Sequence, residues 1–454
     1  MEIAIKTGTV KDKLISEFEL SKSFLFGNTK LRDQAMESFC KQGIPTRKHE
    51  EYKYTHVGLM LKDEFYFSTN KNCTEEQIED LKFLKDAYVV IIENGIFVRG
   101  SSNLQNLPKG LTICSLVDAV KSNSTVFEKH YAQYTDVYAD PFIALNTAMN
   151  KDGVFIHIAK NVTIEKPIHI IHISTAFENT IIHPRNLIVV DENTQAKIIE
   201  SFETVDSTAK IFSNSLTEIV INENAIVDHY KIQDENACLP PACRLPAGQA
   251  GTGRDRQELG YLVNTTQVIQ KKQSVFSTHT ITLSGSLVRN NLTLVLDGEH
   301  IESHLYGLYL TAGNQVVDNH TVVDHRKPNC NSNQLYKGII DGKSTATFNG
   351  KIFVRKDAQK TNAFQSNKNI LLSEAGPINT KPQLEIYADD VKCSHGTSTG
   401  KLDEDKIFYL RARGLSLSSA KKLLMHAFAS EVVDTIKIEP LREYIEGKIA
   451  KIFE

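Results

Sequence analysis

The dominant pattern along the chain is a succession of short strand-like runs between about residues 153 and 385. Apolar and polar residues alternate in several of them, as in NNLTLVL at 290–296, which is typical of a strand with one face in a core. Turn residues such as Asn-Gly, Asp-Gly and Glu-Asn separate the runs at fairly regular spacing, and no long helical pattern intervenes. Such a series favours a sandwich, a barrel or a β-helix.

Three details favour the β-helix. The runs continue through this region with little domain punctuation, and Asp341-Gly342 and Asn349-Gly350 extend the same rhythm towards its C-terminal side. Polar residues recur at similar places, as if they stacked on successive rungs; they are Asn290, Asn291, His304, Asn319 and His320. On the pattern alone, a double β-sandwich stays open as the alternative.

One stretch, about residues 237–257, breaks the rhythm because it is rich in Pro and Gly. We interpret it as a surface insertion between two strands. It contains Cys238 and Cys243, but no second pair of ligands lies nearby at a spacing that suits zinc.

Helical patterns flank the β-rich region. Apolar residues at i, i+4 and i+8 around Ala35 predict a helix, while two β-branched runs around Asn94-Gly95 predict a hairpin. We therefore expect an N-terminal helical domain with a small hairpin over 1–150, and a β-rich core over 151–385.

The C-terminal part, residues 386–454, is expected to be a second helical domain. A short helix over 402–413 should end at Gly414, and a longer helix should follow, with apolar residues at a 3.6-residue period. A last helix should begin near Pro440. Both long helices have a wide apolar face, part of which is available for a partner.

Composition narrows the function classes. The 52 Lys and Arg residues nearly balance the 55 Asp and Glu residues and are scattered, so no nucleic acid or membrane partner is expected. Residues 1–11 lack the apolar stretch of a secretory signal, and no run is long enough to span a membrane. We expect a cytoplasmic protein whose seven cysteines are reduced thiols. No Walker A string and no Gly-x-Ser-x-Gly elbow is present.

Two blocks of sequence are more specific. The first is IPTRKHEEYKYT at 44–55, and the second includes AQKTNAFQSN at 358–367, DDVKCSHG at 389–396 and FYLRARG at 408–414. These blocks resemble the SufB/SufD family of iron–sulfur cluster assembly proteins, and the first favours the SufD branch. The resemblance covers the N-terminal block and most of the chain from about 260 to 430. Two departures are the insertion and Tyr52, where the family has Trp.

The resemblance implies a right-handed parallel β-helix between two helical domains. It also implies a scaffold without catalytic turnover, which pairs with SufB through the β-helix ends and docks the SufC ATPase through its C-terminal helices. A cysteine desulfurase and its sulfur carrier would act on the complex indirectly. The candidate docking residues are Phe408, Leu410, Leu423, Leu424 and Phe428. Whether the isolated chain forms a homodimer stays open, although an exposed β-helix end would allow self-pairing when SufB is missing.

Cys393-Ser394-His395 is the sharpest candidate site. Thiolate is a soft ligand and imidazole a borderline one, so both suit iron and sulfide. One chain supplies too few ligands here for a closed cluster, which normally takes four. The resemblance implies that His395, with Cys393 beside it, contributes to a transient iron–sulfur cluster or iron site shared with SufB, while the isolated chain binds no cofactor. A buried Cys and a backbone-bonded His are the structural alternative.

Two other groupings have metal-capable residue types. His300, Glu302 and His304 alternate along one predicted strand, and Asp324-His325 lies near Cys330. Solvated rung edges and turns produce the same patterns, so a structural role is favoured for both.

Two other functions stay open. One is a β-helix carbohydrate-active enzyme, although such chains are usually secreted and need clustered carboxylates along an open groove, which the sequence does not indicate. The other is a pure interaction module without a cluster site.

Overall fold

The computed structural model describes residues 10–61, 65–67, 73–122, 124–205, 207–238 and 260–453. Most of the predicted insertion at 237–257, including Cys243, lies outside these residues.

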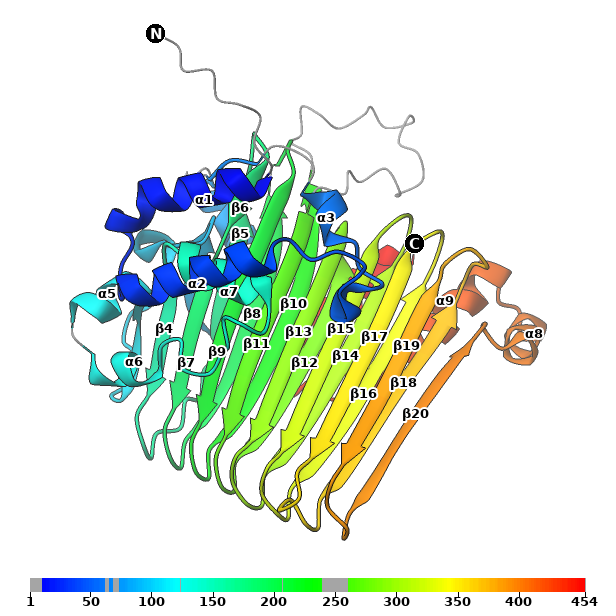
Figure 1. Ribbon diagram of the computed structural model, residues 1–454. Helices are drawn as coiled ribbons and strands as arrows, with labels where there is room; N and C mark the ends of the chain where they lie inside the picture. The colour runs from blue at the N-terminus through cyan, green and yellow to red at the C-terminus, as the bar shows by residue number, and fades with distance from the viewer. Residues whose placement is uncertain are drawn as a thin grey trace.

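The centre of the molecule is a parallel β-solenoid made of two stacked sheets (Figure 1). From β7 onwards, successive strands of the chain alternate between the sheets, so each strand pairs with the strand two places further along. The first sheet continues through β5 (Ile168–Ser174), β8 (Gln195–Val205), β10 (Ile226–Cys238), β12 (Val275–Ser284), β14 (Glu302–Thr311), β16 (Asn331–Ile340), β18 (Asn362–Leu371) and β20 (Lys392–Gly400). The second contains β4 (Gly153–Ile158), β7 (Arg185–Val190), β9 (Ile211–Ile221), β11 (Gly260–Gln270), β13 (Leu287–Leu296), β15 (Val316–His325), β17 (Thr345–Val354) and β19 (Ile378–Ile386), and β6 (Thr180–Ile182) pairs with β9. The prediction of a mainly β protein with a parallel β-helix is confirmed, and this topology rules out the double sandwich.

In-register stacking fills the interior with rows of like side chains. Val227, Phe276 and Leu305 belong to the apolar core between the sheets. The predicted stacking of polar residues is real at Asn290 and Asn319, whose side chains are 3.0 Å apart, but both are buried rather than at a solvated edge. The interior of this solenoid is therefore partly polar.

A ladder of asparagines marks one corner of the rungs. Asn161, Asn193 and Asn224 all have positive φ, at 61°, 56° and 59°. Asn224 Nδ2 donates to Asn193 Oδ1, and Asn193 Nδ2 donates to Asn161 Oδ1, both at 3.0 Å. Asn tolerates the left-handed conformation that these turns need, so the same residue recurs at each turn.

The N-terminal region carries helices and also contributes strands. Its helical segments are α1 (Val10–Ser21), η1 (Lys22–Phe24), α2 (Thr29–Gln42), η2 (Glu50–Tyr52), α3 (Val57–Met60), α4 (Glu75–Asp80), η3 (Arg99–Ser101), α5 (Leu116–Lys121), α6 (Thr125–His130) and α7 (Pro141–Met149). Its strands are β1 (Tyr88–Glu93), β2 (Ile96–Phe97) and β3 (Leu111–Ser115). The hairpin at Asn94-Gly95 is present, but β1 also pairs in parallel with β5, so the hairpin begins the first sheet. Apolar residues of α1, α2 and α7 pack together against the second sheet (Figure 1).

At the other end, the solenoid continues to Gly400, past the boundary at 385 expected from the sequence. The reason is that β20 is polar along its length and lacks the alternation that marks the other strands. The helices α8 (Glu404–Ala412), α9 (Leu417–Val433) and α10 (Glu439–Ile452) follow, and α9 and α10 pack against the outside of the first sheet. Among the described residues, no helix is long and apolar enough to cross a membrane.

Candidate functional site

The C-terminal end of the solenoid is the setting of the candidate site. In the described part of the chain, β20 is the last strand of the first sheet and β19 the last of the second, so each has one unpaired edge (Figure 1). Nearly every residue of β20 is exposed, which is unusual in a stack whose other strands are mostly buried. An edge of this kind presents free backbone donors and acceptors to another chain.

Cys393 and His395 lie on the same face of β20, next to the interior of the previous rung. Their register partners in β18 are Ala363 and Gln365, which are both buried. Cys393 is half-buried and packs against the apolar interior, and this burial raises the pKa of its thiol. His395 is exposed. The imidazole is therefore the readier ligand, because a metal must first displace the proton of the thiol.

The five predicted docking residues do not form one uniform surface. Phe408 on α8 and Leu423 on α9 are 75% and 49% exposed, while Leu410 and Leu424 are half-buried. Phe428 packs against the solenoid, with its ring centroid 4.1 Å from Lys337 Nζ and its carbonyl oxygen accepting from the same atom at 2.7 Å. Phe428 thus anchors α9, and the free apolar surface is centred on Phe408 and Leu423.

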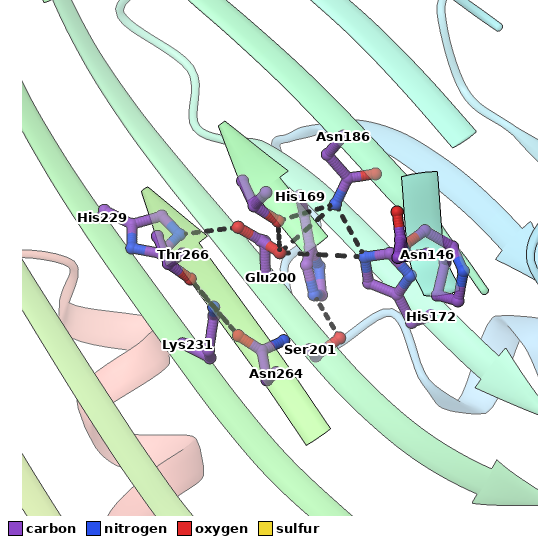
Figure 2. A network of polar contacts seen from close by, with 12 residues as sticks. Asn146, His169, His172, Asn186, Glu200, Ser201, His229, Lys231, Asn264 and Thr266 are labelled. Atoms are coloured by element: carbon purple, nitrogen blue, oxygen red, sulfur yellow. Dashed lines mark hydrogen bonds and ion pairs between the residues drawn. The ribbon is translucent and has the colours of Figure 1, made fainter. Parts of the chain in front are cut away.

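A network of polar residues lies inside the solenoid and was not expected from the sequence (Figure 2). Glu200 on β8 is fully buried, and its Oε1 lies 2.8 Å from His229 Nε2. Its Oε2 accepts from Thr217 Oγ1 at 3.0 Å and from Asn186 Nδ2 at 3.3 Å, and it lies 3.8 Å from His172 Nε2. These side chains come from five strands, so the network joins several rungs of both sheets.

Charges decide the protonation of this network. Burial alone would raise the pKa of Glu200, but nearby Lys231, His229 and His172 lower it below its ordinary value. Burial lowers the pKa of His172 to about 4 and also lowers that of Lys231. The Lys231 ammonium donates to Asn264 and Thr266, so Glu200 stays ionised beside a hydrogen-bonded cation. The arrangement is a closed, buried cluster of hydrogen bonds and charges.

The first sequence block is tied to the solenoid by a second charged network. Arg289 on β13 is buried, forms an ion pair with Asp318 at 2.6 Å, and lies 3.9 Å from the ring centroid of Tyr52. His320 lies between Asp318 and Glu51, at 2.8 Å and 3.3 Å. This cluster explains part of the run of charges in the block, because Glu51 at the C-terminal side of the run pairs with His320 on β15.

A second carboxylate of this block extends the network to the last rung. Glu50 pairs with Lys381 on β19 at 2.6 Å. The block therefore spans from the middle of the second sheet to its end strand.

The two other groupings named in the sequence do not form metal sites. Asp324 pairs with Arg355 and Arg326, at 2.7 Å and 2.9 Å, while buried His325 bonds to Ser332. Glu302 pairs with His304 at 2.8 Å. Across the described residues, no group of three or more His, Cys, Asp or Glu side chains is placed to hold a metal ion. A metal site on this chain would need ligands from elsewhere.

Comparisons with known proteins agree with the sequence blocks. The SufBD core domain of the SUF system for FeS cluster assembly matches residues 172–428, and the SufBD protein N-terminal region matches residues 20–170. An iron–sulfur cluster assembly SufBD family protein of Synechocystis is 32% identical over 409 residues, which cover 88% of this chain and 85% of that protein. The iron–sulfur cluster assembly protein SufD of Escherichia coli is 28% identical over 424 residues, covering 92% and 91%. A chloroplastic protein of Arabidopsis thaliana, ABCI7, is 26% identical over 436 residues.

The core match begins within β5, runs along the solenoid through β20 and ends within α9. It therefore includes both the buried network around Glu200 and the open end of the solenoid. The chain belongs to the SufBD family of iron–sulfur cluster assembly proteins and is a homologue of SufD.

Proposed function

We propose that this chain is a non-catalytic scaffold subunit of an iron–sulfur cluster assembly complex, in which it pairs with SufB and docks the SufC ATPase. The observation that carries the proposal is the open solenoid end, where an exposed strand with an unpaired edge holds His395. Membership of the SufBD family indicates the process, which is iron–sulfur cluster assembly. The open end provides a strand edge with which a partner strand can pair.

The cluster or iron is cargo, held at the contact between this chain and SufB. His395 would provide one ligand, and the partner would provide most of the others. The described residues at the open end of the solenoid offer fewer than the four ligands that a cluster normally takes. Cys393 is the weaker candidate because its thiol faces the apolar interior and its pKa is raised by burial. A site split between two chains also suits transfer, since separating the chains removes ligands together.

SufC would dock on the surface around Phe408 and Leu423. Phe408 and Leu423 are large apolar side chains that the described part of the chain leaves exposed, and exposed apolar patches mark interaction sites. The cysteine desulfurase and its sulfur carrier would meet the complex rather than this chain. In the absence of SufB, the same open end would favour a homodimer. The proposal places the chain in the cytoplasm, a reducing compartment in which cysteines persist as thiols.

A carbohydrate-active enzyme is the less favoured function. The sequence did not indicate clustered carboxylates, but the structure groups Glu203, Asp234 and Glu235. All three are buried, and α10 lies over them, with Lys448 2.7 Å from Asp234 and Tyr444 3.4 Å from Glu203. Carboxylates in a glycosidase flank a bond in an accessible groove, which this cluster does not provide.

The decisive experiment is anaerobic cluster reconstitution on the co-expressed assembly with SufB and SufC, comparing wild type, His395→Ala and Thr397→Ala. Thr397 is the matched control because it is exposed on the same face of β20. His395→Ala should leave the complex intact and reduce the iron–sulfur absorbance by roughly tenfold or more, as expected when a ligand is lost. Thr397→Ala should behave as wild type.

Each other outcome is informative. If His395→Ala forms the complex with an unchanged absorbance band, the chain is an interaction module and the ligand assignment is wrong. If the wild-type chain does not co-purify with SufB and SufC, the scaffold proposal itself fails.

A further inference from the structure

A row of amides inside the solenoid leads to the open end. Gln334 on β16, Gln365 on β18 and His395 on β20 are register partners on three successive rungs. Gln334 Nε2 donates to Thr321 Oγ1 at 2.6 Å, and Gln365 Nε2 donates to Gln334 Oε1 at 2.8 Å. Gln365 therefore directs its donor to the preceding rung, away from the last one, and Gln334 directs its donor across the interior to β15.

The acceptor of the last amide has no partner among the described residues. Gln365 is 3% exposed, and no described group donates a hydrogen bond to its Oε1. Flipping the Gln365 amide alone would not help, because Gln334 Oε1 would then face an oxygen. A buried acceptor without a donor is costly. The next position in the register holds His395, whose ring carries an N–H in either neutral tautomer.

The opposite wall of the solenoid leaves room for the Gln365 amide. A Cβ built on Gly350 would collide with Nε2 and Cδ of Gln365, so the amide occupies space that a glycine at 350 leaves free. The hydrogen bond to Gln334 limits the movement of Gln365, whereas the exposed His395 side chain is free to rotate towards it.

We propose that Gln365 is a positioning residue for His395. Its Oε1 accepts a hydrogen bond from one ring nitrogen of His395, which fixes the tautomer and leaves the lone pair of the other nitrogen directed away from the interior. Metal-ligating histidines generally use their second nitrogen in this way. The inference rests on the proposed function for its purpose, but the contact between the two side chains can be tested without any cluster.

The test uses the full-length chain with nitrogen-15-labelled histidine, in which the His395 signals are identified by their loss in His395→Ala. In wild type, the ring nitrogens should report one dominant neutral tautomer. Gln365→Leu removes the acceptor and should shift both signals towards the mixed tautomers of a solvent-exposed imidazole. Identical His395 signals in wild type and Gln365→Leu would overturn the proposal.

Gly350→Ala provides an independent variant, since it leaves Gln365 in the chain but displaces its amide. It should shift the His395 signals in the same direction as Gln365→Leu. If Gln365→Leu does not fold, as judged by circular dichroism, unchanged His395 signals in Gly350→Ala would overturn the proposal instead.

Cluster formation separates this inference from the function on which it rests. In the reconstituted assembly, Gln365→Leu should lower the cluster yield by roughly tenfold. If His395→Ala has no effect on the yield, the proposed function fails, while the tautomer measurement still decides the contact. If His395→Ala abolishes the cluster and Gln365→Leu changes neither signals nor yield, only the positioning role fails.

Discussion

Glu200 carries an ionised carboxylate in the interior of the solenoid, where it is fully buried. Its pKa is lowered because Lys231, His229 and His172 together outweigh the effect of burial. A buried charge of this kind contributes little net stability when compared with an apolar side chain, but removing one partner leaves the others without compensation. The network is therefore best understood as a set of interactions that fixes the register of neighbouring rungs.

The substitution Glu200→Gln tests this interpretation. It keeps the volume of the side chain but leaves the Lys231 ammonium without its counter-charge, so the free energy of unfolding should fall by about 3 kcal/mol. Urea denaturation of the isolated chain measures the change. Glu223→Gln is the matched control, because Glu223 is exposed at a turn between rungs, and its effect should stay within about 0.5 kcal/mol. Equal effects of the two substitutions would contradict the proposed coupling.

Sequence reasoning reached some of these residues and not others. His395 and Cys393 could be singled out because a thiol and an imidazole two residues apart suit iron chemistry and match a family motif. The partners of Glu200 could not, because alternation shows which side chains share a face of one strand but not which rungs become neighbours. Only the register of the stack brings together residues of different strands, such as Asn186 on β7 and Glu200 on β8. The same holds for Gln365, whose relation to His395 exists only across strands.

Helices and strands differ in how well their positions can be predicted from local sequence. The end of α8 near Gly414 is a local signal and was predicted. The capping of α9 by Ser416 is equally local. The strand β20 was missed because its sequence has no apolar alternation. The alternation is absent because β20 is the end strand, and no further rung covers its inner face.

The apolar surface on α8 and α9 leads to a prediction at the scale of these helices. Replacing Phe408 and Leu423 together by Ser should abolish co-purification with SufC and leave the thermal midpoint of the isolated chain unchanged, because both side chains are already largely in water. Phe24→Ser, at an 88% exposed phenylalanine of the N-terminal region, is the control and should retain SufC. Retention of SufC by the double variant would place the docking surface elsewhere.

At the scale of the whole molecule, the solenoid and the elements packed on it bury an unusual number of titratable groups. Burial lowers the pKa of seven histidines below the ordinary 6.5. The effect is large for five of them: His169, His183 and His279 are lowered to about 3, and His172 and His325 to about 4. Burial has the opposite effect on carboxyl groups. It raises the pKa of Glu203 to about 8, of Glu235 to about 7 and of Asp152 to about 6.

These two sets predict how stability depends on pH. Below pH 6.5 the unfolded chain binds protons at the five histidines that the folded chain cannot bind, so the free energy of unfolding should fall as the pH drops towards 4. The three carboxyl groups act in the other direction. They are protonated in the folded chain and ionised in the unfolded chain, so their contribution is complete below about pH 4 and is lost as the pH rises through 6 to 8. Below pH 6.5 the five histidines lower the free energy of unfolding more than the three carboxyl groups raise it. The stability is therefore greatest near neutral pH.

The urea midpoint measured from pH 5 to pH 9 should therefore pass through a maximum close to pH 7. The double variant Glu203→Gln and Glu235→Gln should lose most of the decline above pH 7 and keep the decline below pH 6, because it removes two of the carboxyl groups and none of the histidines. A decline above pH 7 that is the same in the variant and in wild type would show that the acidic cluster beneath α10 is already ionised in the folded protein. In that case Lys448, which lies 2.7 Å from Asp234, compensates the cluster more fully than burial opposes it.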